Sequence, residues 1–429
     1  MSADREQPPR IQAAQRNQIQ LRPYDLDSTL AEDHRARAIW AAVEQLDLGA
    51  FYDDILARGS HPGRPAIDPK ILVALWLFAT SEGVGSARQL ERLCERDDAY
   101  RWLCGGVSVN HHSLSDFRVG HEAALDGMMT QLIAVLVHQK IIKLKRVAHD
   151  GMRVRASAGA ASFRSGKTLE ECAAEAAAQV AALKRELETE PSGSTTREQA
   201  ARERAARERA EAVARALKEL PKVQAVKDRN RRSDRNRRRK HRRAEARVST
   251  TDPEARVMKV GDGGWRPAYN VQLATDTESR FIVGVRVTNE ASDQGLLKPM
   301  LDHLEQRTGV LPAEYLADGG FVKKEAIEEA ANRGVCVYMP VPKSRVSSID
   351  PHRRKKGDSA TIARWRERMG TERAKAIYKL RAATAETVNA DLRCWRGLDR
   401  LNIRGLVKVS CGALWAALAY NVLRWMALG

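Results

Sequence analysis

The cysteines of this sequence lack the spacings that bind zinc or that form the disulfide frameworks of small secreted domains. No two of them form a CxxC pair, and none has a histidine at zinc-ligand spacing. Their scatter argues against a structural zinc site and favours reduced, mostly structural thiols, as expected in the cytosol. The six cysteines are at positions 94, 104, 172, 336, 394 and 411.

A long uncharged apolar run near the start is also missing. The opening MSADREQPPR has no signal core, and ILVALWLFA (71 to 79) is too short to span a bilayer. The closing ALWAALAYNVLRWMAL is longer but contains Arg424, so we expect a buried terminal helix. These features predict a cytoplasmic protein without a membrane partner.

Acidic residues are too few to balance the basic ones. The chain has 73 Lys and Arg against 55 Asp and Glu, a formal net charge of +18. This excess indicates a polyanionic partner, most simply nucleic acid, although a merely basic soluble protein is the alternative. Residues 227–247 hold 12 Lys or Arg and 3 acids, which is half of the excess. They predict a flexible arm that contacts DNA backbone, with Arg237, Arg238 and Arg239 among its contacts; a solvated linker is the other interpretation.

The length of 429 residues predicts two or three domains. Residues 1–35 are polar and look like a flexible lead-in, and residues 36–138 look all-helical. A helix is expected after Asp68, with a break at Gly83 and Gly85 and a restart at Ser86. Two helices joined in this way form a candidate helix-turn-helix that binds DNA, although any small helical bundle shows similar breaks between its helices.

Residues 139–429 are expected to form a second domain, interrupted at 160–247. Within the interruption, Leu169 to Leu187 and Ala206 to Leu220 carry apolar residues at alternating spacings of three and four. This rhythm predicts a coiled-coil hairpin that leads into the basic block. The hairpin would serve as a spacer or dimer contact, or pack only on itself.

Without the interruption, the second domain alternates strands and helices. Strands are expected at 139–155, as a hairpin at 269–288, and in AEYLADGGF and VCVYMPVP, with helices after Ser292, at 323–333 and from 360 onward. The pattern predicts an α/β sheet whose first strands are antiparallel.

Two aspartates are expected at the ends of adjacent strands of this sheet. In VAHDGMRVRASA, Asp150 shares its parity with Ala148, Met152 and Val154, so it faces the core or its rim. Asp318 ends a later strand, before two glycines. A pair of carboxylates in a partly dry site is well neutralised by Mg²⁺, although turn formation or capping explains either aspartate alone. The other candidates have simpler explanations: Asp276 is expected in a turn, Asp293 at a helix cap, and His149 on the opposite face of the strand.

A third acid is expected on the helix YKLRAATAETVNADLR (378 to 393). Glu386 and Arg393 are seven residues apart and therefore share a face, about 10 Å along the axis. Tyr378 and Arg381 precede them. Glu386 would complete a metal site while Arg381 and Arg393 hold phosphates, and solvated helix charge is the alternative.

At these residues the chain resembles the DDE transposases of bacterial insertion sequences. The resemblance runs through WLCGGVSVNHHSLSDFR, AHDGMRVRASA, STTDPEARVMKVGDGGWRPAYNVQLATD, YLADGGF and YKLRAATAETVNADLRCWRGLDRLNIRGL. The last motif is similar to the Tyr, Arg, Glu, Lys pattern of the family, with Arg393 in the Lys place, and with Asn389 and Ala390 where an aromatic residue and a glycine are usual.

The resemblance implies a ribonuclease H-like mixed sheet flanked by helices, with Asp150, Asp318 and Glu386 as the catalytic and metal-binding triad. It also implies two Mg²⁺ ions, for which Mn²⁺ may substitute, and DNA as partner: the terminal inverted repeats of the element and the target. Tyr378, Arg381 and Arg393 would contact that DNA. We expect DNA cleavage and strand transfer by a homodimer in a synaptic complex. The alternatives are a catalytically inactive, transposase-derived DNA-binding protein and a junction-resolving nuclease.

Overall fold

A mixed six-stranded sheet forms the centre of the molecule. The computed structural model describes residues 25–55, 57, 65–189, 196–233, 245–343 and 350–428. Neighbouring strands run in the order β4, β5, β1, β7, β8, and β6 also pairs with β5. The strands are β1 (Arg146–Arg155), β4 (Arg256–Lys259), β5 (Trp265–Asp276), β6 (Ile282–Thr288), β7 (Glu314–Ala317) and β8 (Cys336–Tyr338).

Strand β1 lies between an antiparallel and a parallel half of this sheet. It pairs with β5 antiparallel and with β7 parallel, and β7 pairs with β8 parallel. On the side of β5 away from β1, β4 pairs with the first part of β5 and β6 pairs with the rest. The antiparallel start predicted from the sequence is therefore present. Because β1 is central, Val147 and His149 are buried as fully as Ala148, so the burial of its first half does not alternate.

Capping residues define the helices that precede the sheet. Asp68 accepts a hydrogen bond from the Lys70 backbone N–H, and Ser86 accepts one from Gln89, so the break around Gly83 lies as predicted. The helices are α1 (Arg35–Glu44), α2 (Gly49–Tyr52), α3 (Pro69–Ser81), α4 (Ala87–Arg96), α5 (Asp98–Cys104), α6 (His111–Gly120) and α7 (Glu122–His138).

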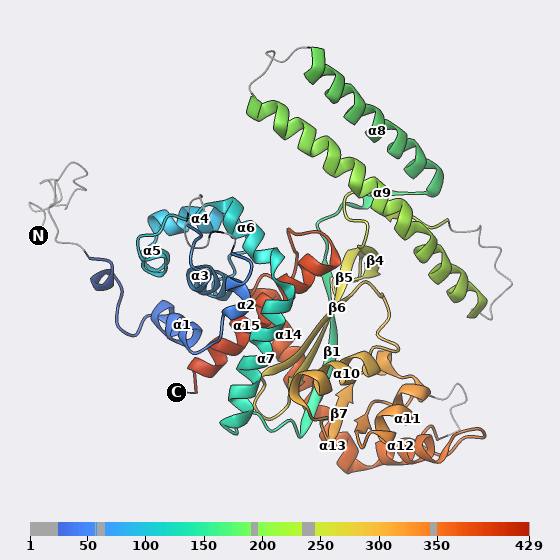
Figure 1. Cartoon of the computed structure of the whole chain (residues 1–429). Helices are drawn as coiled ribbons and strands as arrows, with labels where there is room; N and C mark the ends of the chain where they lie inside the picture. Colours follow the sequence, from blue (N-terminus) through green and yellow to red (C-terminus); the bar gives the residue numbers. More distant parts are fainter. Residues whose placement is uncertain are drawn as a thin grey trace, which may run out of the picture.

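The last helix joins these helices to the sheet. Helix α15 (Leu406–Met426) packs against α3, α6 and α7 and also against β6 (Figure 1). By length and composition it is the one helix of the described chain that could cross a membrane, but about two thirds of its apolar window is buried in the molecule. Its Asn421 side chain bonds to the Ile282 backbone N–H and carbonyl, at 2.9 and 2.8 Å. The expected buried terminal helix is thus observed.

Further helices pack against strands β1, β6, β7 and β8. Helices α10 and α11 pack on each other and contact β6 and β8 respectively, while α13 contacts β1, β7 and β8. These helices are α10 (Leu297–Thr308), α11 (Lys324–Asn332), α12 (Ala360–Gly370), α13 (Glu372–Arg381) and α14 (Thr387–Trp395). A π-helical segment, η5 (Ala382–Glu386), joins α13 to α14.

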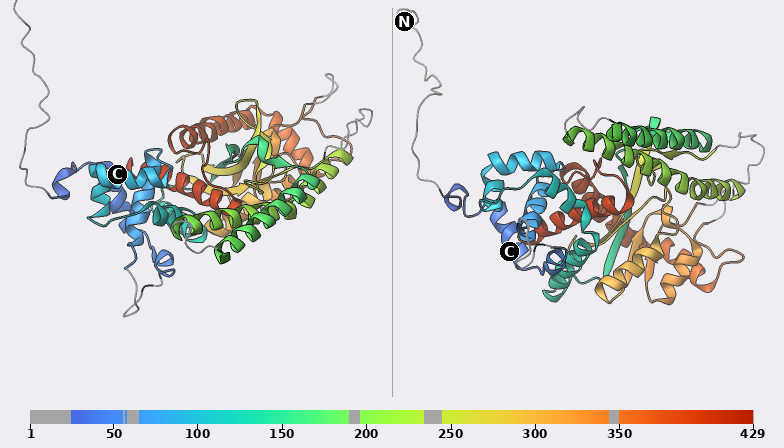
Figure 2. Two further views of the ribbon diagram at one scale, coloured as in Figure 1. Left: turned by 90° about the horizontal axis from the view of Figure 1, so that it is seen from above. Right: turned by 45° about the horizontal axis from the view of Figure 1, so that its top comes forward.

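A long helical hairpin projects from the sheet, as Figures 1 and 2 show. It consists of α8 (Gly166–Thr189) and α9 (Thr196–Ser233), which pack along each other with Leu169, Ala176 and Val213 buried. A two-stranded sheet, β2 (Phe163–Arg164) with β3 (Val248–Ser249), closes its base.

Helix α9 extends further than the apolar rhythm predicts. It continues through Pro221 and into the start of the basic block, for which the sequence predicted a flexible arm. The returning chain stabilises this extension, because Gln224 accepts a hydrogen bond from the Ala246 N–H and Lys227 donates to the Glu245 carbonyl. Arg237, Arg238 and Arg239 lie outside the described residues.

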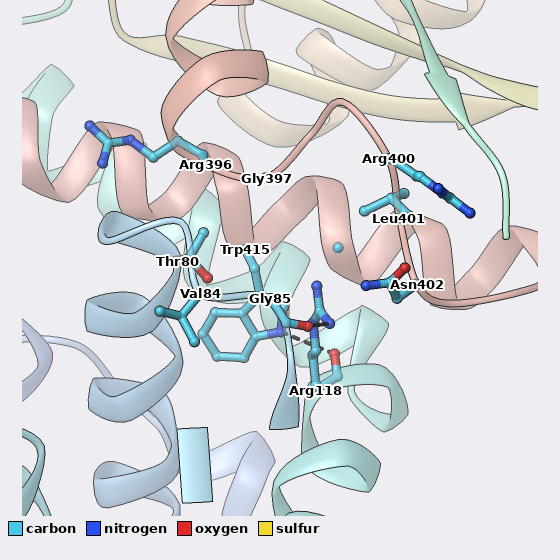
Figure 3. A pocket seen from close by; sticks show the side chains of 11 residues that line it. Thr80, Val84, Gly85, Arg118, Arg396, Gly397, Arg400, Leu401, Asn402 and Trp415 are labelled. Atoms are coloured by element: carbon cyan, nitrogen blue, oxygen red, sulfur yellow. Dashed lines mark hydrogen bonds between the residues drawn. The ribbon is translucent and has the colours of Figure 1, made fainter. Parts of the chain in front are cut away.

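The turn after α3 packs against the loop that follows α14. Arg396 donates a hydrogen bond to the Ser81 carbonyl, and Trp415 donates to the Arg118 carbonyl at 3.0 Å. A cavity of about 30 Å³ remains at this junction, and the Arg118 side chain extends into the region between the two segments (Figure 3). The helices of the amino-terminal part therefore pack directly against the segment that follows Glu386 and α14.

Candidate active site

The strand register brings Asp150 and Asp318 to the same level of the sheet. His149 pairs with Ala317 across the parallel strands β1 and β7, and each aspartate is the next residue in its chain. Burial raises the pKa of Asp150, and the negative charge of Asp318 adds to this increase. The two residues come together from positions 168 apart because parallel pairing sets the end of β7 beside the middle of β1.

Asp150 is held in a largely buried position. Its side chain is 18% exposed, and burial raises the pKa of this carboxyl to about 6, against the opposing effect of the Arg381 charge. Oδ1 accepts a hydrogen bond from the Gly151 N–H at 3.0 Å. Oδ2 accepts one from Asn389 Nδ2 at 3.1 Å and lies 3.4 Å from Arg381 Nη1.

The π-helical segment η5 brings Glu386 beside Arg381. In a regular α-helix, residues five apart point in different directions, whereas an i to i+5 turn brings them into line. Arg381 Nη2 lies 3.2 Å from Glu386 Oε1. One guanidinium, 14% exposed, therefore contacts the carboxylates of both Asp150 and Glu386. The Glu386 side chain itself is 62% exposed, and η5 packs against β1 and β5.

Two further residues of the predicted site differ in their surroundings. Tyr378 lies next to Arg381, with the guanidinium carbon 5.9 Å from the ring centre, and burial raises the pKa of its hydroxyl. Arg393 lies against the β4–β5 turn, where its Nη1 would be 3.2 Å from a Cβ atom at Gly261. The structure thus groups Tyr378, Arg381, Asp150 and Glu386, and it gives Arg393 a separate contact.

The structure agrees with some of the simpler explanations given for Asp276, His149 and Asp293, and contradicts one. Asp276 accepts hydrogen bonds from the N–H and hydroxyl of Ser279, as expected of a turn residue. His149 is fully buried, with its Nδ1 2.6 Å from the Tyr315 hydroxyl, and burial lowers its pKa to about 3. The assignment of Asp293 to a helix cap is wrong, because α10 begins after Leu296 without a side-chain cap.

Asn389 and Asp293 are site-proximal residues that the sequence did not identify as such. Asn389 follows Glu386 by three residues and so shares its helix face, a signal that was available in the spacing. Asp293 is buried and bonded to polar side chains of β1 and β5. Its only signal was the presence of Asn270 and Gln272 in an otherwise apolar strand, since buried amides require partners.

The donor atoms of the site suit a hard divalent cation better than a soft one. Asp150, Asp318 and Glu386 offer carboxylate oxygens, which Mg²⁺ prefers, and they come from the elements that converge on β1. Within the described residues, however, no three acidic, histidine or cysteine side chains are grouped closely enough to hold a metal ion. Glu386 is turned onto Arg381, so a three-carboxylate site requires this side chain to change rotamer.

Two protein families match parts of the chain. Residues 24–119 match the family described as Transposase domain (DUF772), and residues 246–422 match the family described as Transposase DDE domain. The second match includes Asp318 and Glu386, while Asp150 precedes the interruption at 160–247. No curated protein and no solved structure matches the chain. The two family matches together cover more than half of the chain, which therefore belongs to the DDE transposases of insertion sequences.

Proposed function

We propose that this transposase cuts and joins DNA at the ends of its insertion sequence, with Asp150, Asp318 and Glu386 as the catalytic acids. The observation that carries the proposal is the pairing of His149 with Ala317, which aligns two aspartates beside the segment that bears Glu386. Two Mg²⁺ ions, or Mn²⁺ in their place, would be held by these three carboxylates. Metal ions of this kind supply a water of lowered pKa and neutralise charge on the leaving oxygen.

The reaction has two steps at phosphorus. In the first, a water oxygen bonds to the phosphorus at the end of the element while the bond to the 3′ oxygen breaks, and that oxygen gains a proton. In the second, the freed 3′ hydroxyl oxygen loses its proton and bonds to a target phosphorus, while the bond from that phosphorus to the target's own 3′ oxygen breaks and this oxygen gains a proton. Both steps are displacements in line, so the residues of the site act by binding and orienting the phosphates.

Arg381 and Tyr378 are suited to that orienting role. The Arg381 guanidinium is largely buried, contacts two carboxylates and presents a fork of donors that matches a phosphate. Asn389 holds the Oδ2 atom of Asp150 and thereby limits the rotation of this carboxylate. Arg393 would contact DNA from α14, beside the β4–β5 turn.

The sheet supports a ribonuclease H-like assignment for residues 139–429. Three strands in antiparallel succession, β6, β5 and β1, are followed by two parallel strands, β7 and β8, and the hairpin of 160–247 leaves the sheet after β1. A central first strand that carries an acid at the middle of the sheet suits the proposed catalysis. The lead-in of 1–35 and the helical domain of 36–138 complete the proposed division.

The helical domain would bind the terminal inverted repeats through α4. Arg88, Arg92 and Arg96 follow one another at intervals of four on α4, and all three are exposed. None of them forms an ion pair with another described residue, so their charges are available to DNA phosphates. The block at 227–247 would add contacts without sequence preference, and a homodimer would hold two element ends together.

A cleavage assay with the DNA that flanks the gene tests this function. Sequencing that DNA identifies the inverted repeats, and a duplex carrying one repeat is then incubated with the full chain and Mg²⁺. We expect nicks at the repeat boundary that disappear when the repeat is scrambled. Binding without cleavage in any divalent metal would favour the inactive DNA-binding protein, and equal cleavage of scrambled or branched DNA would favour a junction-resolving nuclease.

A further inference from the structure

Asp293 is a buried carboxylate that the proposed catalytic steps do not use. It lies in the segment between β6 and α10, and its side chain is 8% exposed. Its Oδ1 accepts hydrogen bonds from Asn270 Nδ2 at 2.8 Å and Gln272 Nε2 at 2.9 Å, and its Oδ2 lies 2.7 Å from Arg153 Nη2. Burying a charge is expensive unless it is paired, and this carboxylate has three donors from two central strands.

The network around Asp293 lies behind Asp150, on the other face of the sheet. Gly151 pairs with Gln272, and Arg153 pairs with Asn270, across β1 and β5. Side chains alternate between the faces of a strand, so these positions point away from the side chain of Asp150. The Asp293 carboxylate therefore lies on the face of β1 opposite to the side chain of Asp150, beside Gly151.

Glycine is required after Asp150 because Asp293 and its partner Gln272 occupy the space of a side chain. A Cβ atom at Gly151 would lie 2.5 Å from Asp293 Oδ1 and closer still to Gln272 Nε2. A Cβ atom at Gly320, in the turn after Asp318, would have Asp293 Oδ2 at 3.7 Å. One carboxylate thus packs beside the glycines that follow both aspartates.

We propose that Asp293 is a positioning residue that fixes the strand at Asp150–Gly151 and the turn after Asp318 relative to each other, so that the carboxylates of Asp150 and Asp318 can share a divalent cation. The inference deepens the proposed function and rests on it. Asp293 is among the three nearest neighbours of an added Cβ atom at Gly151 and also at Gly320.

Residues that orient metal ligands typically change affinity by about 10- to 100-fold when they are replaced. We therefore expect Asp293→Asn and Gly151→Ala each to weaken Mn²⁺ binding by about 10-fold or more. Both variants disturb the packing of the Asp293 network against Gly151, the first by removing the charge and the second by adding a methyl group. Mn²⁺ affinity of the full chain, measured by titration calorimetry without DNA, gives a readout separate from catalysis.

Two matched variants separate positioning from loss of stability. Asp358 is another buried carboxylate bonded to an arginine, Arg366, at 2.8 Å, so Asp358→Asn should lower the melting temperature and leave Mn²⁺ affinity within about twofold. A Cβ atom at Gly319 would meet only Pro340 Cγ at 3.5 Å, an ordinary contact, so Gly319→Ala should be tolerated.

The outcomes are distinct. Weaker Mn²⁺ binding in Asp293→Asn and Gly151→Ala, with near-normal binding in Asp358→Asn and Gly319→Ala, supports the inference. Unchanged binding in the first two variants overturns it, and so does an equal loss in Asp358→Asn. If the wild-type chain binds no Mn²⁺, or if Asp150→Asn does not reduce its binding, the proposed function itself fails and the inference fails with it.

Discussion

Asn389 donates a hydrogen bond to Oδ2 of Asp150, 239 residues earlier in the chain, at 3.1 Å. This bond crosses from α14 to the central strand and fixes the carboxylate from the side of the helix. Replacement by alanine should lower the cleavage rate by about 10-fold, because residues that orient a metal ligand contribute at this scale. The rate of repeat cleavage at saturating DNA checks the prediction.

Asn389→Asp is the comparison for this variant. It exchanges a donor for a second negative charge beside Asp150, so its loss of cleavage should exceed that of Asn389→Ala. Equal rates in Asn389→Ala and the wild type would show that the bond has no catalytic consequence.

The raised pKa of Asp150 predicts how stability depends on pH. Burial raises this pKa from 3.8 to about 6, so the unfolded chain loses its proton at lower pH than the folded chain. Folding is therefore penalised progressively as pH rises from about 4 to about 6, and the penalty remains above that range. Asp150→Asn has no such proton to lose. Without divalent cations, its melting temperature should rise relative to the wild type between pH 4 and 6; a constant difference would contradict the assigned shift.

Gly83 tests the packing between the helical region and the loop after α14. It has a φ of +72°, and a Cβ atom there would lie 3.1 Å from the Trp395 carbonyl oxygen. Gly83→Ala should destabilise the chain by about 1–3 kcal/mol, since strain and crowding both oppose the new methyl group. Denaturant unfolding measures this change.

Gly106 is the matched control for this substitution. Its φ is +82°, but nothing lies within 4 Å of an added Cβ atom. Gly106→Ala should report backbone strain alone and therefore cost less than Gly83→Ala. Equal costs would indicate that the contact with Trp395 contributes nothing.

The arginines of α4 predict a change in salt dependence. Each phosphate contact adds about 0.9 to the slope of log affinity against log salt, so Arg92→Gln should reduce the slope for repeat DNA by about 1. Arg101→Gln removes the same charge from the next helix, but Arg101 Nη1 lies 3.1 Å from Asp98. Its effect on the slope should be smaller. Equal slopes for Arg92→Gln and the wild type would remove α4 from the DNA surface.

Local chemistry made much of the fold predictable. Asp68 and Ser86 cap the helices that the sequence predicted, and Asp276 closes the expected hairpin, because these side chains bond to backbone groups a few residues away. The proximity of Asp150 and Asp318 was expected from the position of Asp318 at a strand end, and the pairing of β1 with β7 accounts for it. These features depend on interactions within a short segment or on a simple rule for parallel strands.

The remaining features depend on contacts between distant segments. The π-helical turn before Glu386 cannot be inferred from spacing, because an α-helical pattern does not contain the extra residue in the turn. Asp293 has its partners on β1 and β5, and only their register shows that one carboxylate lies near both Gly151 and Gly320. The continuation of α9 beyond Pro221 likewise depends on the returning chain at 245–248.

Cleavage by variants of the three acids tests the central claim most directly. Asp150→Asn, Asp318→Asn and Glu386→Gln are compared with Asp391→Asn, which changes an acid on α14 that is ion-paired with Arg396. We predict that each of the first three variants binds repeat DNA within about twofold of the wild type but cleaves it at least about 1,000-fold more slowly in Mg²⁺, a loss of about 4 kcal/mol in transition-state stabilisation. Asp391→Asn should cleave normally. Near wild-type cleavage by any one of the three would contradict the account.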